Sequence, residues 1–314
     1  MQVIHDALRS TDLPRPSVLT IGNYDGVHLG QRNLVERTVA RARELGLPAV
    51  VVTFDPHPLK VLHPESAPGA ITTARQKERL LAGLGIDALA VVTFNSEVAE
   101  IPAESFVRQF LAGGLEARTI FVGRRFAFGR GREGNVALLE KLGPELGFEV
   151  VAVEELAIEG EAVSSSRIRR ALADGRVDLA GRLLGRPFSL EGEIVAGDRM
   201  GSKLGWPTIN LRHEGELVPM EGVYASRVHF PSYPATFDSV TNIGTRPTVY
   251  ENHQRIIESH ILDFRSDVYG ERIELSFHKR LRDEMLFPSV MALSAQIRRD
   301  VDTTREYFFD AARS

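Results

Sequence analysis

The apolar residues in the first half of the chain follow two alternating patterns. Short apolar runs, which predict buried strands, occupy residues 18–21, 49–54, 88–94, 119–122 and 150–153. Between them, apolar residues recur every three or four positions and predict helices at residues 34–45, 74–84, 102–111 and 136–146. Strands that alternate with helices indicate a parallel sheet covered by helices on both faces. A ligand of such a sheet binds at the carboxyl ends of the strands.

The pattern changes near Arg186 and Pro187. Two more helical stretches precede this point, at residues 166–173 and 177–184. Strand-like segments separated by proline and glycine turns follow it, at residues 189–195, 223–228, 237–243, 256–262 and 273–277, and residues 289–309 predict a long helix. Short strands in series predict a small antiparallel barrel or sandwich. We therefore expect an α/β chain with a doubly wound, Rossmann-like parallel sheet in residues 1–185 and an antiparallel β-barrel with a terminal helix in residues 186–314.

The composition narrows the class of protein. The chain has 314 residues, of which 43% are hydrophobic and 25% are charged, as in a globular protein with two domains. The absence of cysteine excludes disulfides, thiolate zinc sites and thiol nucleophiles. A net charge of −4 argues against a nucleic-acid partner, because such binding depends on a positive field. No apolar run is long enough to span a membrane and the first residues lack a signal-peptide pattern, so we expect a cytoplasmic protein with no membrane partner.

A glycine-rich loop with the sequence GNYDGVHLGQ follows the first predicted strand, at residues 22–31. Its glycines allow a tight turn and a close approach of the backbone to a ligand. The helix that begins there offers free N–H groups and a positive dipole end, which suit a phosphate. His28 is placed to donate a hydrogen bond as charge builds on that phosphate. By itself, the loop is also compatible with an ordinary strand-to-helix turn that carries a surface histidine.

Three more segments follow predicted strand ends and therefore belong at the same edge of the sheet. They read TFDPHP at residues 53–58, VGRRFAFGRGREG at residues 122–134 and SSSRIR at residues 164–169. Arg167 is placed to hold a phosphate with two hydrogen bonds. The serines could equally cap the following helix, and His57 could be a rigid turn residue between two prolines. The nine histidines show no metal-ligand spacing.

The second half contains another glycine-rich loop, GDRMGSKLGWPTIN at residues 197–210. Backbone N–H groups of such a loop can surround phosphates, and the hydroxyl of Thr208 and the carboxamide of Asn210 are oxygen ligands that suit Mg²⁺. Glu258 lies in an alternating strand, IIESHIL, where it could act as a base. The alternatives are a barrel loop with Trp206 packed on the core and an exposed strand glutamate.

Together these segments resemble the bacterial bifunctional riboflavin kinase/FAD synthetase family along nearly the whole chain. HLGQ at residues 28–31 is similar to the H-x-G-H motif of its nucleotidyltransferase module. PTIN at residues 207–210 is similar to the Pro-Thr-Ala-Asn motif of its kinase module, and GTRPT at residues 244–248 to a Gly-x-Arg-Pro-Thr segment. Glu258 before ILDF and the LRDE turn at residues 281–284 complete the resemblance.

The resemblance implies that FMN attacks the α-phosphorus of ATP at the N-terminal site and releases pyrophosphate. His28 would stabilise charge on the α-phosphate, and Arg167 would join it as a catalytic residue that holds the triphosphate. The implied ATP-binding residues are Gly22, Asn23, Asp25, Gly26, His28, Gly30, Gln31, Ser164, Ser165 and Arg167. The implied flavin contacts are Phe54, Asp55, His57, Pro58, Phe126 and Phe128.

The resemblance further implies that the C-terminal site phosphorylates riboflavin, with ATP as co-substrate and Mg²⁺ as cofactor. Thr208 and Asn210 would hold the metal, and Glu258 would take the proton from the ribityl 5′-hydroxyl. The implied ATP-binding residues are Gly197, Gly201, Lys203, Gly205, Thr208 and Asn210. Arg282 and Glu284 would contact the flavin.

Two departures from the family pattern leave alternatives open. Gln31 replaces the second histidine of H-x-G-H, and Arg125 replaces an aspartate or asparagine before Phe126. The chain could therefore be a riboflavin kinase with an impaired adenylyltransferase half, or a flavin-binding protein without catalysis. The presence of Thr208, Asn210 and Glu258 favours an enzyme whose partners are riboflavin, FMN, FAD and ATP. The sequence does not determine the oligomeric state.

Overall fold

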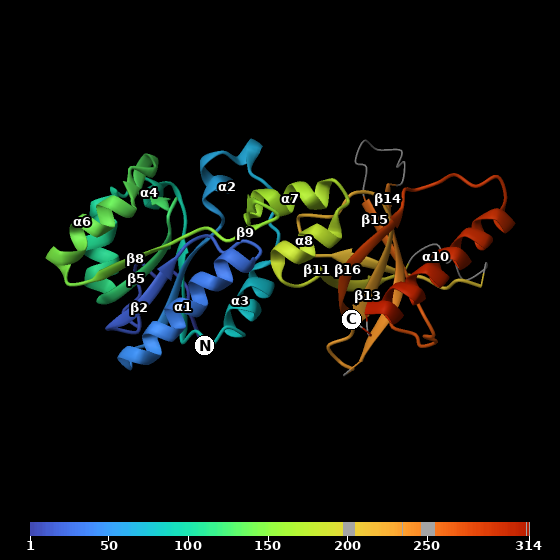
Figure 1. Ribbon diagram of the computed structural model, residues 1–314, viewed down its shortest axis with the longest axis horizontal. Helices are drawn as coiled ribbons and strands as arrows, with labels where there is room; N and C mark the ends of the chain where they lie inside the picture. Colours follow the sequence, from blue (N-terminus) through green and yellow to red (C-terminus); the bar gives the residue numbers. More distant parts are fainter. Residues whose placement is uncertain (197–204, 234, 246–254, 312, 314) are drawn as a thin grey trace. The chain divides into compact units, whose positions relative to one another are not determined.

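The computed structural model describes residues 1–196, 205–233, 235–245, 255–311 and 313. The chain divides into two compact units, Met1–Ser165 and Ser166–Ser314, which are coloured blue to green and yellow to red in Figure 1. This geometric division assigns the helices before Pro187 to the second unit.

The first unit contains a six-stranded parallel sheet, as the alternating pattern predicted. The strand order is β1 (Gln2–Ile4), β4 (Ala88–Thr93), β3 (Ala49–Asp55), β2 (Ser17–Ile21), β5 (Ala117–Gly123) and β8 (Glu149–Val153). From β2 the chain adds β3 and then β4 on one side of β2. It then crosses over, and β5 pairs with β2 on the other side. The strand order therefore reverses between β2 and β5, where ligands of such sheets bind. The three-residue edge strand β1 is too short to show a periodic pattern, and the sequence did not predict it.

Helices cover both faces of this sheet. In β3, Val50 and Val52 face one apolar cluster and Val51 faces the other, because successive side chains of a strand point to opposite faces. The helical elements are α1 (Leu29–Leu45), α2 (Pro58–Leu62), α3 (Ala74–Ala82), α4 (Ser96–Ala99), α5 (Ala103–Phe106) and α6 (Val136–Leu146), with the short 3₁₀ turns η1 (Pro64–Ser66) and η3 (Arg130–Arg132). The helix predicted at residues 102–111 begins after Pro102 and continues from α5 as a π-helix, η2 (Val107–Gly114). Two short hairpins pair β6 (Ala127–Phe128) with β7 (Gly134–Asn135) and β9 (Ala157–Ile158) with β10 (Glu161–Ala162).

In its described residues, the second unit is a closed antiparallel barrel with two helices before it in the chain and one after it. The strand order is β11 (Phe188–Val195), β12 (Ile209–His213), β15 (Arg255–Ile261), β14 (Thr236–Thr245), β13 (Gly222–His229) and β16 (Arg272–Arg282). The helices are α7 (Ser165–Ala173), α8 (Val177–Leu184) and α10 (Val290–Ala311). The barrel and the terminal helix confirm the expected fold, and closure excludes a sandwich. Strand β12 was not predicted, since it has only five residues and its first two belong to the glycine-rich segment at residues 197–210.

The barrel interior combines apolar side chains with a chain of buried hydroxyls. Ser226 Oγ lies 2.8 Å from Ser239 Oγ and 2.6 Å from Thr241 Oγ1, and Thr241 Oγ1 lies 2.8 Å from Ser259 Oγ. These hydroxyls satisfy one another, which removes the penalty of burying them. Of the side chains that point outward from the same strands, Val223 and Val240 pack against Val301 of α10.

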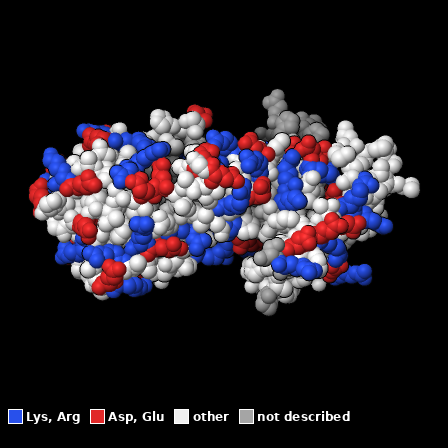
Figure 2. Space-filling model, viewed as in Figure 1, with Lys and Arg blue, Asp and Glu red and all other residues white. Residues whose placement is uncertain are grey.

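Acidic and basic side chains are interspersed over the face drawn in Figure 2. In the described part of the chain, no helix has the length and apolar character needed to cross a membrane.

Candidate active sites

The loop after β2 has an unusual backbone. Tyr24, Gly26 and Val27 have φ values of +49°, +91° and +43°, of which only the glycine adopts such a value without strain. Tertiary contacts hold this conformation. The carboxylate of Asp25 accepts hydrogen bonds from the N–H groups of residues 71 and 72, at 2.9 and 3.3 Å. Asp25 is only 5% exposed, so these buried hydrogen bonds fix the position of the loop.

His28 is the N-cap residue of α1. Its Nδ1 accepts a hydrogen bond from Gln31 N at 3.3 Å, while the side-chain oxygen of Gln31 accepts one from His28 N at 3.1 Å. A neutral ring that accepts at Nδ1 carries its hydrogen on Nε2. Gly30 makes room for the ring, since a Cβ at residue 30 would lie 3.3 Å from His28 Cε1. The geometry therefore leaves Nε2–H as the ring donor of His28.

Asn23 is held from two other elements. Its carbonyl oxygen accepts hydrogen bonds from Thr53 Oγ1 of β3 at 3.1 Å and from Lys77 Nζ of α3 at 3.0 Å. The side chains of Asn23 and His57 meet at 3.1 Å. The sequence predicted that the segment at residues 53–58 lies beside the loop, and these contacts place Thr53 and His57 there. Sequence reasoning missed Lys77, because a lysine on an amphipathic helix normally faces solvent.

Aromatic side chains gather at the ends of β3 and β5. Phe54 and Phe126 are partly buried against the same apolar cluster that contains the buried Phe128. Phe126 and Phe128 stack with ring centroids 5.3 Å apart, and Phe54 meets Phe94 edge to face at 5.9 Å. Phe128 is only 7% exposed, so it forms the buried side of this stacked pair and Phe126 the more exposed side.

The remaining residues predicted to contact flavin lie just beyond β3. Asp55 is exposed at the end of the strand, and Pro58 begins α2, whose N-cap is His57. His57 Nδ1 accepts a hydrogen bond from Leu59 N at 3.2 Å. The capping bond fixes the orientation of the His57 ring.

The serine-rich segment is joined to the same loop. Ser165 Oγ donates to the carbonyl oxygen of Asp25 at 2.9 Å, and Ser164 precedes it in the chain. Arg167 lies in the first turn of α7, is 5% exposed and belongs to the second unit. Arg125, in contrast, is 82% exposed at its side chain and pairs with Glu155 at 3.4 Å.

In the barrel, strand pairing aligns three polar side chains, and a hydrogen bond adds a fourth. Asn210 of β12 lies opposite Glu258 of β15, and Glu258 lies opposite Asn242 of β14. Side chains of directly paired residues share one face of a sheet. Asn242 Nδ2 then donates to Glu284 Oε1 at 3.0 Å. Asn210, Glu258, Asn242 and Glu284 therefore form a polar row across the outer face of the barrel.

A cavity of about 470 Å³ lies at the same two strands, β12 and β15, where it is lined by Ile209, Ser259 and Ile261, whose side chains alternate with those of the row. Its lining includes Thr208, the side chains that follow β15 from Phe264 onward, and Tyr269. Ligand pockets commonly enclose about 300–1,000 Å³. Gly205 is exposed beside this region with a φ of +80°, whereas Gly197, Gly201 and Lys203 lie outside the described residues.

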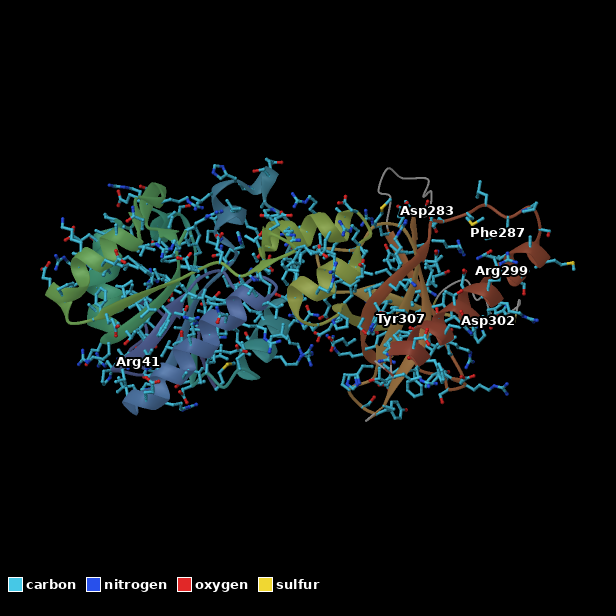
Figure 3. The ribbon with its side chains drawn as sticks, viewed as in Figure 1. Arg41, Asp283, Phe287, Arg299, Asp302 and Tyr307 are labelled. Atoms are coloured by element: carbon cyan, nitrogen blue, oxygen red, sulfur yellow. The ribbon has the colours of Figure 1, made fainter. Side chains whose placement is uncertain are left out.

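Arg282 is the last residue of β16, and its guanidinium makes most of its hydrogen bonds with Asp300 of α10. Its Nε lies 3.1 Å and its second terminal nitrogen 2.8 Å from carboxylate oxygens of Asp300, and the other terminal nitrogen donates to the Asp283 carbonyl at 2.8 Å. Gln296 also donates to Asp300, at 2.8 Å. Figure 3 labels Asp283 and Phe287 on the segment that leads into α10. Arg282 thus joins β16, whose end leads to Glu284 of the polar row, to the terminal helix.

Comparison with known proteins identifies the family. A FAD synthetase family model matches residues 10–167, and a riboflavin kinase family model matches residues 184–308. The bifunctional riboflavin kinase/FMN adenylyltransferase of Escherichia coli (strain K12) is 40% identical over 291 residues, which cover 93% of this chain and 92% of that protein. The chain belongs to this family. It is an ATP-dependent enzyme that phosphorylates riboflavin to FMN and adenylylates FMN to FAD.

Other relatives agree. Proteins of the same name from Pseudomonas fluorescens and Haemophilus influenzae are 39% and 34% identical, over 93% and 98% of this chain and 93% and 99% of their own lengths. A solved structure described as a macrolide-efflux protein from Streptococcus pneumoniae is 29% identical, with a TM-score of 0.89, and covers 97% of this chain and 99% of that one. The family resemblance stated from the sequence is confirmed. Neither alternative, a kinase alone or a flavin-binding protein without catalysis, is supported by these comparisons.

Proposed function

We propose that adenylyl transfer takes place at the loop over residues 22–31 and riboflavin phosphorylation at the polar row of the barrel. The first assignment is supported by the fixed ring of His28 at the start of α1. The second is supported by the alignment of Asn210, Glu258 and Asn242 on three paired strands. Both halves act on soluble anionic or polar substrates with ATP, which favours a cytoplasmic location.

At the adenylyl site, His28 donates from Nε2 to the α-phosphate as negative charge increases in the transition state. A donor fixed before the reaction stabilises such charge without reorganisation. Gly22, Gly26, Gly30 and the N–H groups at the start of α1 bind the phosphates, and the role of Arg167 toward the triphosphate stays a prediction from the sequence. The Ser165 hydroxyl already donates to the loop, so we assign it the support of Asp25 in addition to its role toward ATP.

The flavin of FMN lies against the aromatic ends of β3 and β5 in this proposal. Phe54 and Phe126 present partly buried rings there, and such rings offer flat apolar surface to a flavin. Asp55, His57 and Pro58 form the neighbouring wall. FMN then presents its phosphate oxygen to the α-phosphorus of ATP, and pyrophosphate leaves.

At the kinase site, Glu258 accepts the proton of the ribityl 5′-hydroxyl while the γ-phosphoryl group is transferred. Positioning and charge stabilisation are the main requirements of phosphoryl transfer. The cavity lined by Pro207 and Thr208 receives the nucleotide. Glu284 and Arg282 lie on the flavin side of the row, where Arg282 acts mainly by holding α10.

Thr208 and Asn210 fit Mg²⁺ by their chemistry. A hydroxyl and a carboxamide are hard oxygen ligands, and Mg²⁺ takes few protein ligands because it retains several waters and phosphate oxygens. No cluster of three or more histidine, aspartate or glutamate side chains suited to a metal is present in the described ranges, which favours a metal that arrives with ATP. When bound, Mg²⁺ neutralises charge on the β- and γ-phosphates.

The base assignment is tested by Glu258→Gln, which removes the carboxylate and preserves the shape of the side chain. We expect FMN formation from riboflavin to fall about 10²-fold or more, the scale of general-base loss, while FAD formation from supplied FMN is unchanged. Both products are measured by chromatography. Glu193→Gln is the matched control, because Glu193 is also a half-buried strand carboxylate of the barrel and pairs with Arg212 instead. Normal riboflavin phosphorylation by Glu258→Gln would show that the assigned base is wrong.

A further inference from the structure

Lys77 reaches from α3 into the loop of the adenylyl site. Its Nζ donates to the carbonyl oxygen of Asn23 at 3.0 Å, and Thr53 Oγ1 donates to the same oxygen at 3.1 Å. The Asn23 carbonyl therefore holds a charged and a neutral donor at once. Charge-assisted hydrogen bonds are about twice as strong as neutral ones, so Lys77 makes the stronger of the two contacts.

The surroundings of Lys77 are acidic. Burial lowers the pKa of its ammonium, and the carboxylates of Asp25, Asp55 and Glu78 act in the opposite direction. Asp25 belongs to the loop itself, Asp55 ends β3, and Glu78 is the next residue of α3. These are the charged groups that face the ammonium from the loop, the sheet and its own helix.

This arrangement matters because both substrates of adenylyl transfer are anions. Asp25 is buried in the loop and Asp55 lies beside it, and without a cation their charge would oppose ATP and FMN. Like charges in a partly buried site are screened little by salt. The ammonium of Lys77, whose charge interacts with both carboxylates, offsets that repulsion.

We propose that Lys77 is a positioning residue for adenylyl transfer, which fixes the Asn23 carbonyl and offsets the charge of Asp25 and Asp55 beside the substrates. The proposal rests on the assignment of the adenylyl site to the loop over residues 22–31. Lys77 acts through the loop and its carboxylates, without contact to the reacting atoms. Its loss therefore affects both the rate of adenylyl transfer and the affinity for ATP.

The test compares Lys77→Met, Lys77→Arg and the control Lys141→Met in the full chain. Lys141 is an exposed lysine of α6, so its replacement removes the same charge from a helix surface. We expect Lys77→Met to lower kcat for FMN adenylylation about tenfold or more and to raise KM for ATP severalfold. Lys77→Arg should recover most of this loss, and riboflavin phosphorylation should be unchanged in all three variants.

A pH profile separates this role from a merely structural one. Because burial lowers the pKa of Lys77 below its ordinary 10.5, the ammonium loses its proton at a lower pH than an exposed lysine does. Adenylylation by the wild type should therefore decline on the alkaline side, and Lys77→Arg should shift this decline to higher pH, since arginine stays protonated. This comparison uses an active variant, so it decides the matter even if Lys77→Met unfolds the first unit.

Two results would overturn the proposal. One is wild-type kcat and KM in Lys77→Met, and the other is an unchanged alkaline decline in Lys77→Arg. The variant His28→Ala distinguishes this failure from a wrong site assignment. If His28→Ala is inactive in adenylylation while Lys77→Met is normal, the site is right and only the role of Lys77 is wrong. If His28→Ala is also normal, the site itself is misassigned.

Discussion

At the scale of the residue, the pair His28 and Gln31 shows how one departure from the family motif is accommodated. Gln31 uses its side-chain oxygen to accept the N–H of His28, and its own N–H holds the ring of His28. The side-chain amide of Gln31 therefore completes the N-terminal cap of α1. An amide cannot become a cation, so it gives less stabilisation to a charged phosphate than an imidazolium does.

We expect Gln31→His to adenylylate FMN as fast as the wild type or faster. The gain from a charged donor is about 1–2 kcal/mol, which corresponds to a rate increase of roughly 5- to 30-fold at most. His28→Ala should lower FAD formation by about 10²-fold or more, because the fixed donor is lost. Steady-state assays with FMN and ATP measure both effects, and riboflavin phosphorylation serves as the internal control. A slower Gln31→His variant would mean that the cap geometry matters more than the charge.

At the scale of the element, α10 is tied to β16 by a buried ion pair. The side chains of Arg282 and Asp300 are 18% and 6% exposed, and Gln296 adds a third member to the network. A second ion pair of the same helix, Arg305 with Asp263, is exposed at 51% and 74%. Loss of one partner from a buried pair leaves an uncompensated charge, whereas exposed pairs contribute little.

Asp300→Asn should therefore lower the free energy of unfolding of the barrel by about 2 kcal/mol or more, as measured by urea denaturation. It should also raise KM for riboflavin severalfold, because Arg282 loses the contact that orders the segment before α10. Arg305→Gln is the control and should change stability by no more than about 0.5 kcal/mol. Equal effects of the two substitutions would contradict a special role for the buried pair.

At the scale of the whole molecule, the two helices between the sheet and the barrel decide where the chain can be divided. Five apolar side chains of α8 are buried, and this helix packs on β11 and β16. The N–H of Met220 donates to the carbonyl of Leu172 in α7 at 2.9 Å. The helices are thus part of the folded unit that contains the barrel, although the family model for riboflavin kinase begins only at residue 184.

We expect the fragment Ser166–Ser314 to phosphorylate riboflavin alone and to make no FAD. The shorter fragment 185–314, divided where the sequence pattern changes, should have the same activity but unfold at least about 10 °C lower, because it lacks the apolar side chains that α8 buries. Each buried aliphatic side chain contributes about 1.5–3 kcal/mol, and 1 kcal/mol corresponds to about 4 °C in a domain of this size. Calorimetry and kinase assays measure the two properties. Inactivity of both fragments, with an active full chain, would show that the barrel needs the first unit.

The sequence by itself determined most of the long elements and pointed to two candidate sites. The apolar run at residues 49–54 and the helical spacing at residues 136–146 are local signals, and both elements form where they were predicted. Glycine-rich loops after strands are local signals too, so the loop over residues 22–31 is recognisable from the order of its residues alone. The terminal helix followed from the same reasoning.

Only the tertiary structure decided which side chains meet. Lys77 contacts a carbonyl 54 positions away, and Asn242 reaches Glu284 across 42 positions. The row of Asn210, Glu258 and Asn242 depends on the register of three strands, and a shift of one residue would turn Glu258 to the other face. Periodicity along the chain carries no information about such pairings, because they are set by how separate elements pack. The roles of Lys77 and Glu258 therefore become testable only once the fold brings their partners to them.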